Sequence, residues 1–531
     1  MTRKAPRVST VALLIVLLAA GTAFAQKPGG MLRIAHRDSP ASMSTLEEVT
    51  ISTVAPMIAV FNNLVIFDQR VPQNTMQSIV PDLATGWSWN EDGTELTFHL
   101  RDGVRWHDGQ SFTARDVQCT WDMLLGKSAV KFRINPRRSW YWNLDSVTTN
   151  GNHEAVFHLK QPQPALIALL SSGYSPVYPC HVPPQDMRQH PIGTGPFKFI
   201  SYRPNESIRL TRNPDYWKPD RPYLDGIEWT IIPNRSTALL AFIAGKVDMT
   251  FPYEVTVPLL KDIEQQAPEA ICELRPRGVS STLIVNRNSP PFDNPDLRRA
   301  MALSLDRRSF IDVLSGGQGD IGAAMLPPPE GLWGMPRDRL KALPGYDPDV
   351  QKNRGEARKI MQRLGYGPDN PLPVKVAARN IPLYRDPAVM LIDQLKDIYV
   401  TGELDLVETA NWNPKDGRDY MVGLENTGSA VVDDPDQQLY ESYACDSDRN
   451  FTGYCNPALE DLFHRQSREP DLQRRRELVW DIDTTLQEEG ARPVIFHTRG
   501  ATCWHPEVTG LTTMVNSIYN GWRFEDVWLD R

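Results

Sequence analysis

The chain has 531 residues and a formal net charge of −8 at pH 7, with 57 Lys and Arg against 65 Asp and Glu. The acidic balance and the scattered basic residues argue against nucleic acid or anionic lipid as a partner, since both are bound through basic patches. A chain of this length exceeds what one hydrophobic core usually supports, so two or three domains are predicted.

Residues 1–25 are expected to be a cleavable secretory signal peptide. Basic residues at positions 3, 4 and 7 precede an apolar run, 11–20, that ends at Ala23-Phe24-Ala25, which is the pattern of such signals. The run is shorter than the roughly 20 apolar residues of a membrane span. We therefore expect a soluble exported protein, and cleavage after Ala25 would take its formal charge from −8 to −11.

The cysteines are consistent with an oxidising compartment. Cys445 and Cys455 flank the short polar loop DSDRNFTGY, and a disulfide closing this loop is predicted. A metal site would need closer ligand spacing and a His partner, so none is predicted. Two bridges and four buried thiols are both compatible with the remaining set, Cys119, Cys180, Cys272 and Cys503.

The first half of the chain has the pattern of short strands separated by turns. Strands are expected in GGMLRIAHR, at 63–67 and at 96–100, where apolar residues alternate with polar ones. Turns at 90–93 and 102–103 enclose the third of these strands. Thr113 and Asp116 resemble a capping box, with Asp in place of Glu, ahead of an amphipathic helix. A second hairpin is expected at 146–159, turning at Asn150-Gly151.

The rest of the chain alternates strands with helices. Strands are expected around 197–199, 208–210, in PYLDGIEWTIIP, in LPVKVAAR and at 403–408. Helices are expected at 236–244, after the cap Asn294 and Pro295, at 355–364 and at 388–399. This alternation predicts an α/β fold.

Motifs of catalysis are weak. Ser128 and Lys131 match S-x-x-K, but the accompanying K-T-G and S-D-N motifs are missing. The glycines of 316–319 follow a helix and are interpreted as a cap and turn, not as a phosphate loop. His153 and His158 have no companion ligands, so neither catalytic residues nor a metal are predicted.

Four segments, 81–117, 193–217, 239–249 and 294–312, carry a family resemblance in the family's own order. They begin PDLATGWSWNEDG, GTGPFKFISYRPN, LLAFIAGKVDM and NPDLRRAMALSLD. Together they resemble the dipeptide, oligopeptide and nickel class of family 5 solute-binding proteins of ABC importers. The similarity extends from about Gly30 to Arg531.

The resemblance implies a bilobed α/β periplasmic binding protein fold, class II type, cluster C, with a third small domain. Lobe 1 (domain I) would comprise 26–65, 195–284 and 499–531. The extra domain (domain II) would be 66–194, and lobe 2 (domain III) would be 285–498. Chain crossings near Val285 and Thr498 would serve as the hinge.

The resemblance also implies a function. The protein would be the periplasmic solute-binding component of an ABC importer, a monomer without a cofactor and not an enzyme. It would capture a peptide or peptide-like small molecule by hinge closure and deliver it to permease subunits in the inner membrane. An opine, a sugar, a nickel chelate or another metabolite is an alternative ligand. A secreted hydrolase using Ser128 or an unrecognised pair of acidic residues is the alternative of another class.

Peptide-binding members receive the ligand's amino group on an Asp shortly before a Pro in the second lobe. The matching position here, four before Pro435, is Val431. Asp433 or Asp434 could take this role, or form a turn before the Pro. Uncharged polar side chains of the same segment offer an alternative lining: Asn426, Thr427 and Ser429.

Those members also receive the ligand's carboxylate on an Arg after a strand. Arg379, which ends LPVKVAAR, falls near that position, and a surface Arg is the alternative. Trp412, Trp140 and Trp142 are candidates for stacking on a ligand. For Trp412 the alternative is a core position, and for the cluster around Trp140 it is packing against a neighbouring domain.

Overall fold

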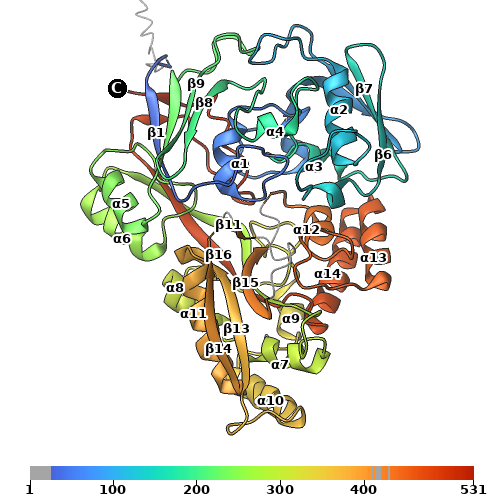
Figure 1. Cartoon of the computed structure of the whole chain (residues 1–531), viewed down its shortest axis with the longest axis vertical. Coiled ribbons are helices and arrows are strands. Elements are labelled where there is room, and N and C mark those ends of the chain that lie inside the picture. The colour runs from blue at the N-terminus through green and yellow to red at the C-terminus, as the bar shows by residue number, and fades with distance from the viewer. Residues whose placement is uncertain (1–25, 409–410, 413–419, 428–430) are drawn as a thin grey trace, which may run out of the picture.

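Two halves joined by two long strands make up the molecule (Figure 1). The computed structural model describes residues 26–408, 411–412, 420–427 and 431–531, and only the backbone of Asn426 and Thr427. The strands β11 (Ile271–Val285) and β16 (Val494–Trp504) pair antiparallel and run from one half into the other.

A four-stranded sheet of the upper half combines the first strand of the chain with three strands from residues 197–231. Its order is β1 (Met31–His36), β10 (Gly226–Ile231), β9 (Ser207–Arg212) and β8 (Phe197–Arg203). β1 is parallel to β10, and the other neighbours are antiparallel. Leu32 and Ile34 of β1 are fully buried, so alternate residues of this strand face the core. Three helices lie in the same half of the molecule as this sheet: α1 (Ile51–Ile58), α5 (Arg235–Ile243) and α6 (Val257–Gln266).

A second four-stranded sheet of the upper half is antiparallel, in the order β4 (Ala84–Trp89), β5 (Glu95–Leu100), β7 (Glu154–Leu159), β6 (Leu144–Thr149). Leu96 and Phe98 are fully buried, as the alternation predicts. The helix α2 (Ala114–Leu124) packs on this sheet.

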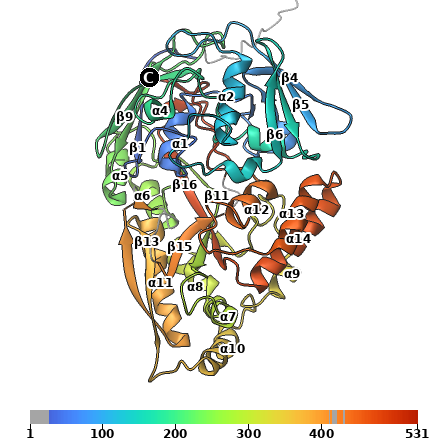
Figure 2. The same ribbon diagram turned by 45° about the vertical axis from the view of Figure 1, so that its right-hand side comes forward.

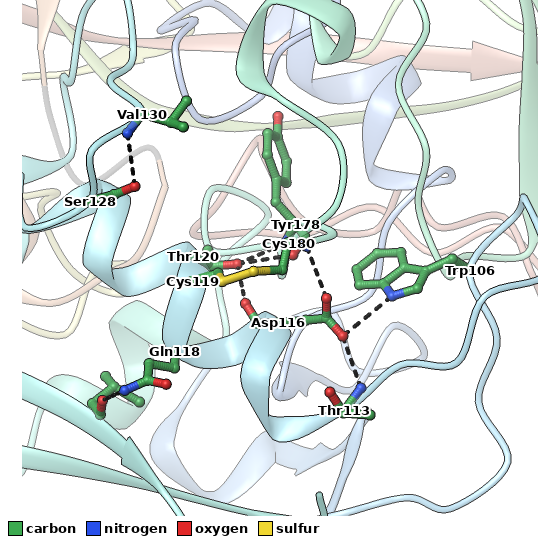
Figure 3. The surroundings of a disulfide bond; sticks show 11 residues. Trp106, Thr113, Asp116, Gln118, Cys119, Thr120, Ser128, Val130, Tyr178 and Cys180 are labelled. Carbon is green, nitrogen blue, oxygen red and sulfur yellow. Dashed lines mark hydrogen bonds between the residues drawn. A yellow bond between two sulfur atoms is a disulfide. The ribbon is translucent and has the colours of Figure 1, made fainter.

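Asp116 fixes the start of α2 (Figure 3). One carboxylate oxygen accepts hydrogen bonds from Thr113 N at 2.9 Å and Trp106 Nε1 at 3.4 Å, and the other accepts from Cys180 N at 2.9 Å. The capping role predicted for Asp116 is therefore present, and the same carboxylate ties the helix to a distant loop.

Short elements complete the upper half. The pairs of short strands are β2 (Val65–Phe67) with β3 (Ile79–Pro81) and β17 (Val508–Thr509) with β18 (Trp528–Leu529). The short helices are α3 (Leu166–Leu170), α4 (Pro184–Met187), η1 (Met76–Ser78) and η2 (Arg138–Tyr141). One buried apolar cluster runs through both four-stranded sheets, so this half is a single packed body.

The lower half has two parts (Figure 2). A six-stranded sheet lies at one side of this half, and a group of helices lies at the opposite side. The sheet order is β12 (Gly319–Asp320), β16, β11, β15 (Val422–Thr427), β13 (Leu372–Arg379), β14 (Val400–Val407). β13 is parallel to both of its neighbours. Four helices and a short turn belong with this sheet: α7 (Pro295–Ser304), α8 (Arg307–Ser315), α10 (Val350–Arg363), α11 (Pro382–Leu395) and η3 (Lys396–Ile398).

The other side of the lower half is helical. α12 (Pro435–Ser442), α13 (Pro457–Arg468) and α14 (Leu472–Glu488) share their own buried cluster, which includes Leu439, Phe463 and Ile482. A short helix, α9 (Arg337–Lys341), lies near this group.

The paired strands β11 and β16 are irregular where they pass between the halves. Their register shifts between Pro276 and Ser280, and Gly278 there has a positive φ of 64°, a backbone conformation that favours glycine. A break in the ladder removes hydrogen bonds that resist bending. Val285, near the predicted hinge, lies at the lower end of β11, where it pairs with Val422 of β15.

Three disulfides are present: Cys119–Cys180, Cys272–Cys503 and Cys445–Cys455. The predicted Cys445–Cys455 bridge closes the polar loop, and the other four cysteines form two bridges rather than remaining thiols. Lys27 Nζ lies 2.5 Å from Asp530 Oδ1, so the first and last described segments meet in the upper half. Within the described ranges, no helix has the length and apolar character to cross a membrane.

Most predicted elements are present, with shifted ends. α10 begins at Val350 rather than Gly355, and α11 begins at Pro382 rather than Ala388 and ends at Leu395. Gly316 is the left-handed C-cap of α8, with φ 54°, so the glycine run does cap a helix. The signal peptide predicted at 1–25 lies outside the described residues.

Candidate ligand-binding site

Ionisable side chains from both halves meet at the boundary between them, all of them buried except Arg449, whose side chain is partly exposed. We call this cluster the interlobe site; its members are Arg37, Asp38, Arg137, Tyr174, Tyr519, Arg379, Glu425, Glu441, Arg449 and Arg492. The first five come from the upper half and the others from the lower half. Buried charges are costly unless they are paired, so the pairing of each one shows what the site can accept.

Arg379 lies at the end of β13 and is only 4% exposed. Its guanidinium carbon is 3.9 Å from the centroid of the Tyr384 ring. Burial lowers its pKa, and the charges of Glu425 and Asp38 oppose this effect. Its Nε has no hydrogen-bond partner, and no carboxylate among the described residues forms an ion pair with it. An Arg remains charged even so, and the group can therefore bind an anion.

Asp38 faces the same boundary from the segment after β1. Both carboxylate oxygens are buried without a hydrogen-bond partner among the described residues. Its nearest cation is Arg37, whose Nε is 4.0 Å away. Arg37 turns instead toward Glu254, at 3.4 Å, so the Asp38 carboxylate can accept hydrogen bonds from a ligand.

Glu254 neutralises the arginines behind Asp38. Its carboxylate lies 3.4 Å from Arg37, 3.0 Å from Arg235 and 3.2 Å from Arg277. Burial raises its pKa, but the three guanidiniums outweigh burial and hold the pKa at about 2. Because Arg277 belongs to β11 just where its register shifts, this cluster stabilises the region in which the halves join.

A pocket of about 530 Å³, counting space open to solvent, lies between the halves beside this cluster. Arg37, Arg235 and Glu254 line it from the upper half, and Ile381 and Pro382 line it from the lower half. Ile381 and Pro382 are two and three residues after Arg379, and Arg37 is itself a member of the interlobe site, so the pocket lies next to that site.

Arg137, from the upper half, is almost fully enclosed, at 1% exposure. It lies on the face of Tyr174, 3.5 Å from the ring centroid, and Nη2 donates to the Glu48 carbonyl oxygen at 2.6 Å. Nε and Nη1 have no partner among the described residues. Burial, together with the nearby Arg449, lowers its pKa to about 10.

Arg449 and Arg492 belong to the lower half, and both guanidiniums lie near Phe451, at 6.0 and 5.5 Å from its ring centroid. Arg449 pairs with Glu441. Arg492 has Nε and Nη2 buried without a partner among the described residues, and burial lowers its pKa to about 10.

The predicted aromatic residues lie at contacts between structural elements. Trp140 Nε1 donates to Glu441 Oε2 of α12 at 3.0 Å, which joins the halves. Trp142 packs on Tyr440 and His464, with ring centroids 4.9 and 4.1 Å away.

Trp412 is half-buried beside Phe451 and donates a hydrogen bond to Glu425. It thus fixes one of the carboxylates of the interlobe site.

The predicted acidic candidates have partners inside the protein. Asp434 caps α12 and forms a two-pronged ion pair with Arg475, at 2.9 and 2.8 Å. Asp433 Oδ2 accepts from Leu332 N at 2.9 Å and Asn516 Nδ2 at 3.2 Å, and burial raises its pKa to about 7.

Val431 is buried in the apolar cluster of the upper half. Asn426 and Thr427 pair with Ser281 and Ser280 of β11 in the sheet, and Ser429 lies outside the described residues.

Ser128 and Lys131 are not paired. Ser128 Oγ accepts from Val130 N at 3.1 Å (Figure 3), while Lys131 Nζ donates to the Gly126 carbonyl oxygen at 2.5 Å. Within the described part of the chain, no group of three or more His, Cys, Asp or Glu side chains is arranged to hold a metal ion.

Sequence reasoning missed Asp38, Arg137, Arg449 and Arg492. None of them belongs to a motif, and their positions along the chain lie between residues 38 and 492. The feature that distinguishes these residues is a charged side chain placed at the boundary between the halves. Such a placement in a loop produces no periodic pattern in the sequence.

A bilobed α/β molecule with charged groups buried between its lobes has the architecture of a solute-binding protein. The model for bacterial extracellular solute-binding proteins, family 5, middle part, matches residues 78–450. The chain belongs to this family, as the sequence motifs predicted.

Relatives and solved structures agree with this assignment. The di/tripeptide-binding protein 1 of Pseudomonas aeruginosa UCBPP-PA14 is 26% identical over 463 residues, covering 81% of this chain and 82% of the relative. The periplasmic binding protein DppA of Helicobacter pylori, in complex with the peptide STSA, has a TM-score of 0.82 at 21% identity over 95% of this chain and 99% of its own. The binding protein AgaA of A. tumefaciens R10, in complex with agropinic acid, has a TM-score of 0.79 at 21% identity, with 94% and 99% covered. These structural similarities confirm the predicted bilobed fold.

Proposed function

We propose that the chain is the periplasmic solute-binding component of an ABC importer. It captures a peptide or peptide-like small molecule between its halves and presents the closed form to permease subunits in the inner membrane. Its family and the di/tripeptide-binding name of a relative that is 26% identical support the proposal. Export by a cleavable signal at 1–25 and action as a monomer are part of it.

Arg379 is the observation that carries this proposal. Its guanidinium is buried between the halves without an acidic partner among the described residues. A buried charge of this kind costs several kcal/mol unless an opposite charge joins it. A ligand carboxylate supplies that charge only when the halves are together, so the ligand favours the closed state through its higher affinity for it.

The position of a ligand amino group is inferred from which carboxylates already have partners within the protein and which do not. Asp434 pairs with Arg475, and Val431 packs in the apolar cluster of the upper half. Asp38 has both carboxylate oxygens without a partner among the described residues. An amino group on the ligand would therefore bind Asp38. Asn426 and Thr427, at the end of β15, and Ser429 are the further contacts in this proposal.

This role requires no change of covalent bonds in the ligand. Ser128 and Lys131, the only motif that could support the hydrolase alternative, each bond to the nearby backbone. The hinge in β11 and β16 supplies the motion that the binding role needs.

Substitution of Arg379 tests the proposal. Isothermal titration of the exported protein with a panel of di- and tripeptides gives the reference affinity, and Arg379→Ala is expected to weaken it by about 10- to 100-fold, the value of a charge-assisted hydrogen bond. Arg385→Ala removes a partly exposed arginine of α11 that pairs with Asp386 and should bind as the wild type does. Equal binding by Arg379→Ala and wild type would contradict the proposal.

A further inference from the structure

The interlobe site contains three arginines, Arg137, Arg449 and Arg492, in addition to Arg379, which alone would suffice to bind one ligand carboxylate. Arg137 and Arg492 are 1% and 2% exposed, and each has two guanidinium nitrogens with no partner among the described residues. Arg449 acts on the pKa of both, so the three cations lie within electrostatic range of one another. They come from the upper half and from two separate segments of the lower half.

The nearby acids do not neutralise this group. Glu441 pairs with Arg449, and its carboxylate also accepts from Trp140 Nε1 at 3.0 Å and Gln437 Nε2 at 2.6 Å. Neither Arg137 nor Arg492 forms an ion pair with a carboxylate among the described residues. Like charges held close together in a site of low solvent access repel strongly. An anion placed between them would attract each cation and offset this repulsion.

The rings around the three arginines hold them in place. Arg137 lies on Tyr174 and donates to the Glu48 carbonyl oxygen, while Arg449 and Arg492 both contact the Phe451 ring. The donors are therefore oriented before a ligand arrives, which reduces the entropy cost of binding. Planar guanidiniums with free N–H groups are the usual partners of carboxylates.

We propose that the ligand carries a second carboxylate in addition to the one bound by Arg379, and that Arg137, Arg449 and Arg492 bind it. This inference rests on the proposed function and makes it narrower. The ligand class is then a small dicarboxylate: a short peptide with an acidic side chain, or an amine-free condensation product with two acid groups. Because Arg137 and Arg492 belong to different halves, the second carboxylate also joins the halves as they close.

Titration of the full exported chain with four compounds tests the inference: Ala-Ala, Ala-Lys, Ala-Glu and N-succinyl-alanine, which has two carboxylates and no amino group. We expect at least one of the two dicarboxylates to bind about tenfold or more tightly than Ala-Ala and Ala-Lys. Preference for Ala-Glu would identify an acidic peptide, and preference for N-succinyl-alanine would identify the amine-free class.

Variants separate recognition from a structural role. Arg492→Gln and Arg137→Gln should each lower the affinity for the dicarboxylate about tenfold more than the affinity for Ala-Ala, since the second carboxylate loses its partner. Arg287→Gln is the control, because Arg287 also lies on a Tyr ring, at 4.5 Å, and donates to a carbonyl, at 3.1 Å, away from the site. It should keep the preference.

Two results would overturn the inference alone: equal affinity for all four compounds, or an equal loss for every compound in Arg492→Gln. In both cases the protein still binds peptides, and the proposed function stands. Binding of none of the four would contradict the proposed function and this inference together.

Discussion

Glu254 shows how one carboxylate can control a boundary between two halves. Three guanidiniums surround it, and they come from the segment after β1, from α5 and from β11. These segments are separated in sequence and packed together only by the fold. The charge of Glu254 therefore offsets three buried positive charges near the place where the halves join.

The stability of the protein should depend on Glu254 at acid pH. Its pKa in the folded protein, about 2, is below the ordinary 4.5, so its stabilisation is complete above pH 4.5 and is lost as the pH falls toward 2. The difference corresponds to about 3 kcal/mol. Urea unfolding of Glu254→Gln at pH 7 should show a loss of about this size.

The acid dependence supplies a second readout for the same variant. Between pH 4.5 and 2 the stability of Glu254→Gln should fall less steeply than that of the wild type, because the titrating group is gone. Glu206→Gln, which alters an exposed pair with Arg203, should follow the wild type at each pH. A Glu254→Gln profile parallel to the wild type would show that the cluster contributes nothing specific.

At this scale the sequence singles out Arg379, because it ends an apolar strand at a position that matches a family pattern. Arg137 and Arg492 carry no such mark, since neither belongs to a motif and each lies beside a helix or strand end. Asp433 and Asp434 fit the predicted acidic segment, yet their partners, Asn516 and Arg475, are 83 and 41 residues away. Local sequence cannot show that such carboxylates are already used.

The loop between Cys445 and Cys455 is the element that presents Arg449 and Phe451. The disulfide closes this loop, and Asn450 donates to the carbonyl oxygens of Ala444, at 3.0 Å, and Tyr454, at 2.5 Å. A short closed loop has few conformations to lose on binding, so the bridge keeps the arginine aimed at the interlobe site.

Removing this bridge should weaken binding more than folding. In the double variant Cys445→Ala, Cys455→Ala we expect a stability loss of about 2 to 3 kcal/mol, the usual effect of a short closed loop, and a clear rise in Kd for the preferred ligand. The double variant Cys119→Ala, Cys180→Ala opens a loop of 61 residues in the upper half. It should lose at least as much stability and keep its Kd, as measured by calorimetry. An unchanged Kd in the first variant would contradict a role for the loop in binding.

Element ends were harder to predict than element types. α11 starts at Pro382 and contains Pro387, and a Pro inside a helical pattern is usually taken as a helix boundary. This explains the predicted start at Ala388. β11 was not predicted as a single strand of 15 residues, because Pro276 and Gly278 interrupt its pattern where the strand changes halves. Both errors fall where the chain has a special backbone role.

At the scale of the whole molecule, hydrogen bonds across the boundary hold the halves together. Trp140 to Glu441, at 3.0 Å, and Gln163 to Asp436, at 2.8 Å, join the second sheet region of the upper half to α12. Ser517 Oγ donates to the Val431 carbonyl oxygen at 2.8 Å nearby. Each such bond adds a small free energy to the closed state.

Loss of one of these bonds should move the ligand-free protein toward the open state. Trp140→Phe keeps most of the apolar contact and removes the indole donor, so we expect the Kd of the preferred ligand to rise by about two- to tenfold. Small-angle scattering should show a larger radius of gyration without ligand. Trp480→Phe removes an indole bond to the Trp333 carbonyl oxygen, 3.0 Å long, within the lower half, and should leave both values unchanged. Identical effects of the two variants would contradict the closing role of Trp140.

The bilobed architecture was implied by the family resemblance, whereas the contacts across the boundary were not. Periodicity reports which face of a helix or strand is buried, but not which half buries it. Trp140 and Trp142 illustrate this, because both the cleft and the neighbouring domain were compatible with the sequence.

The meeting of Lys27 and Asp530 in the upper half matters for any device built from this protein. A surface tether or a fluorescent label placed at Arg531 would hold the upper half and leave the lower half free to swing. Paired with a second label at an exposed site of α10, such as Lys359, it would convert ligand capture into a change of optical signal. The molecule therefore already has the layout of a reagentless biosensor, with its fixed and moving parts separated by the strands β11 and β16.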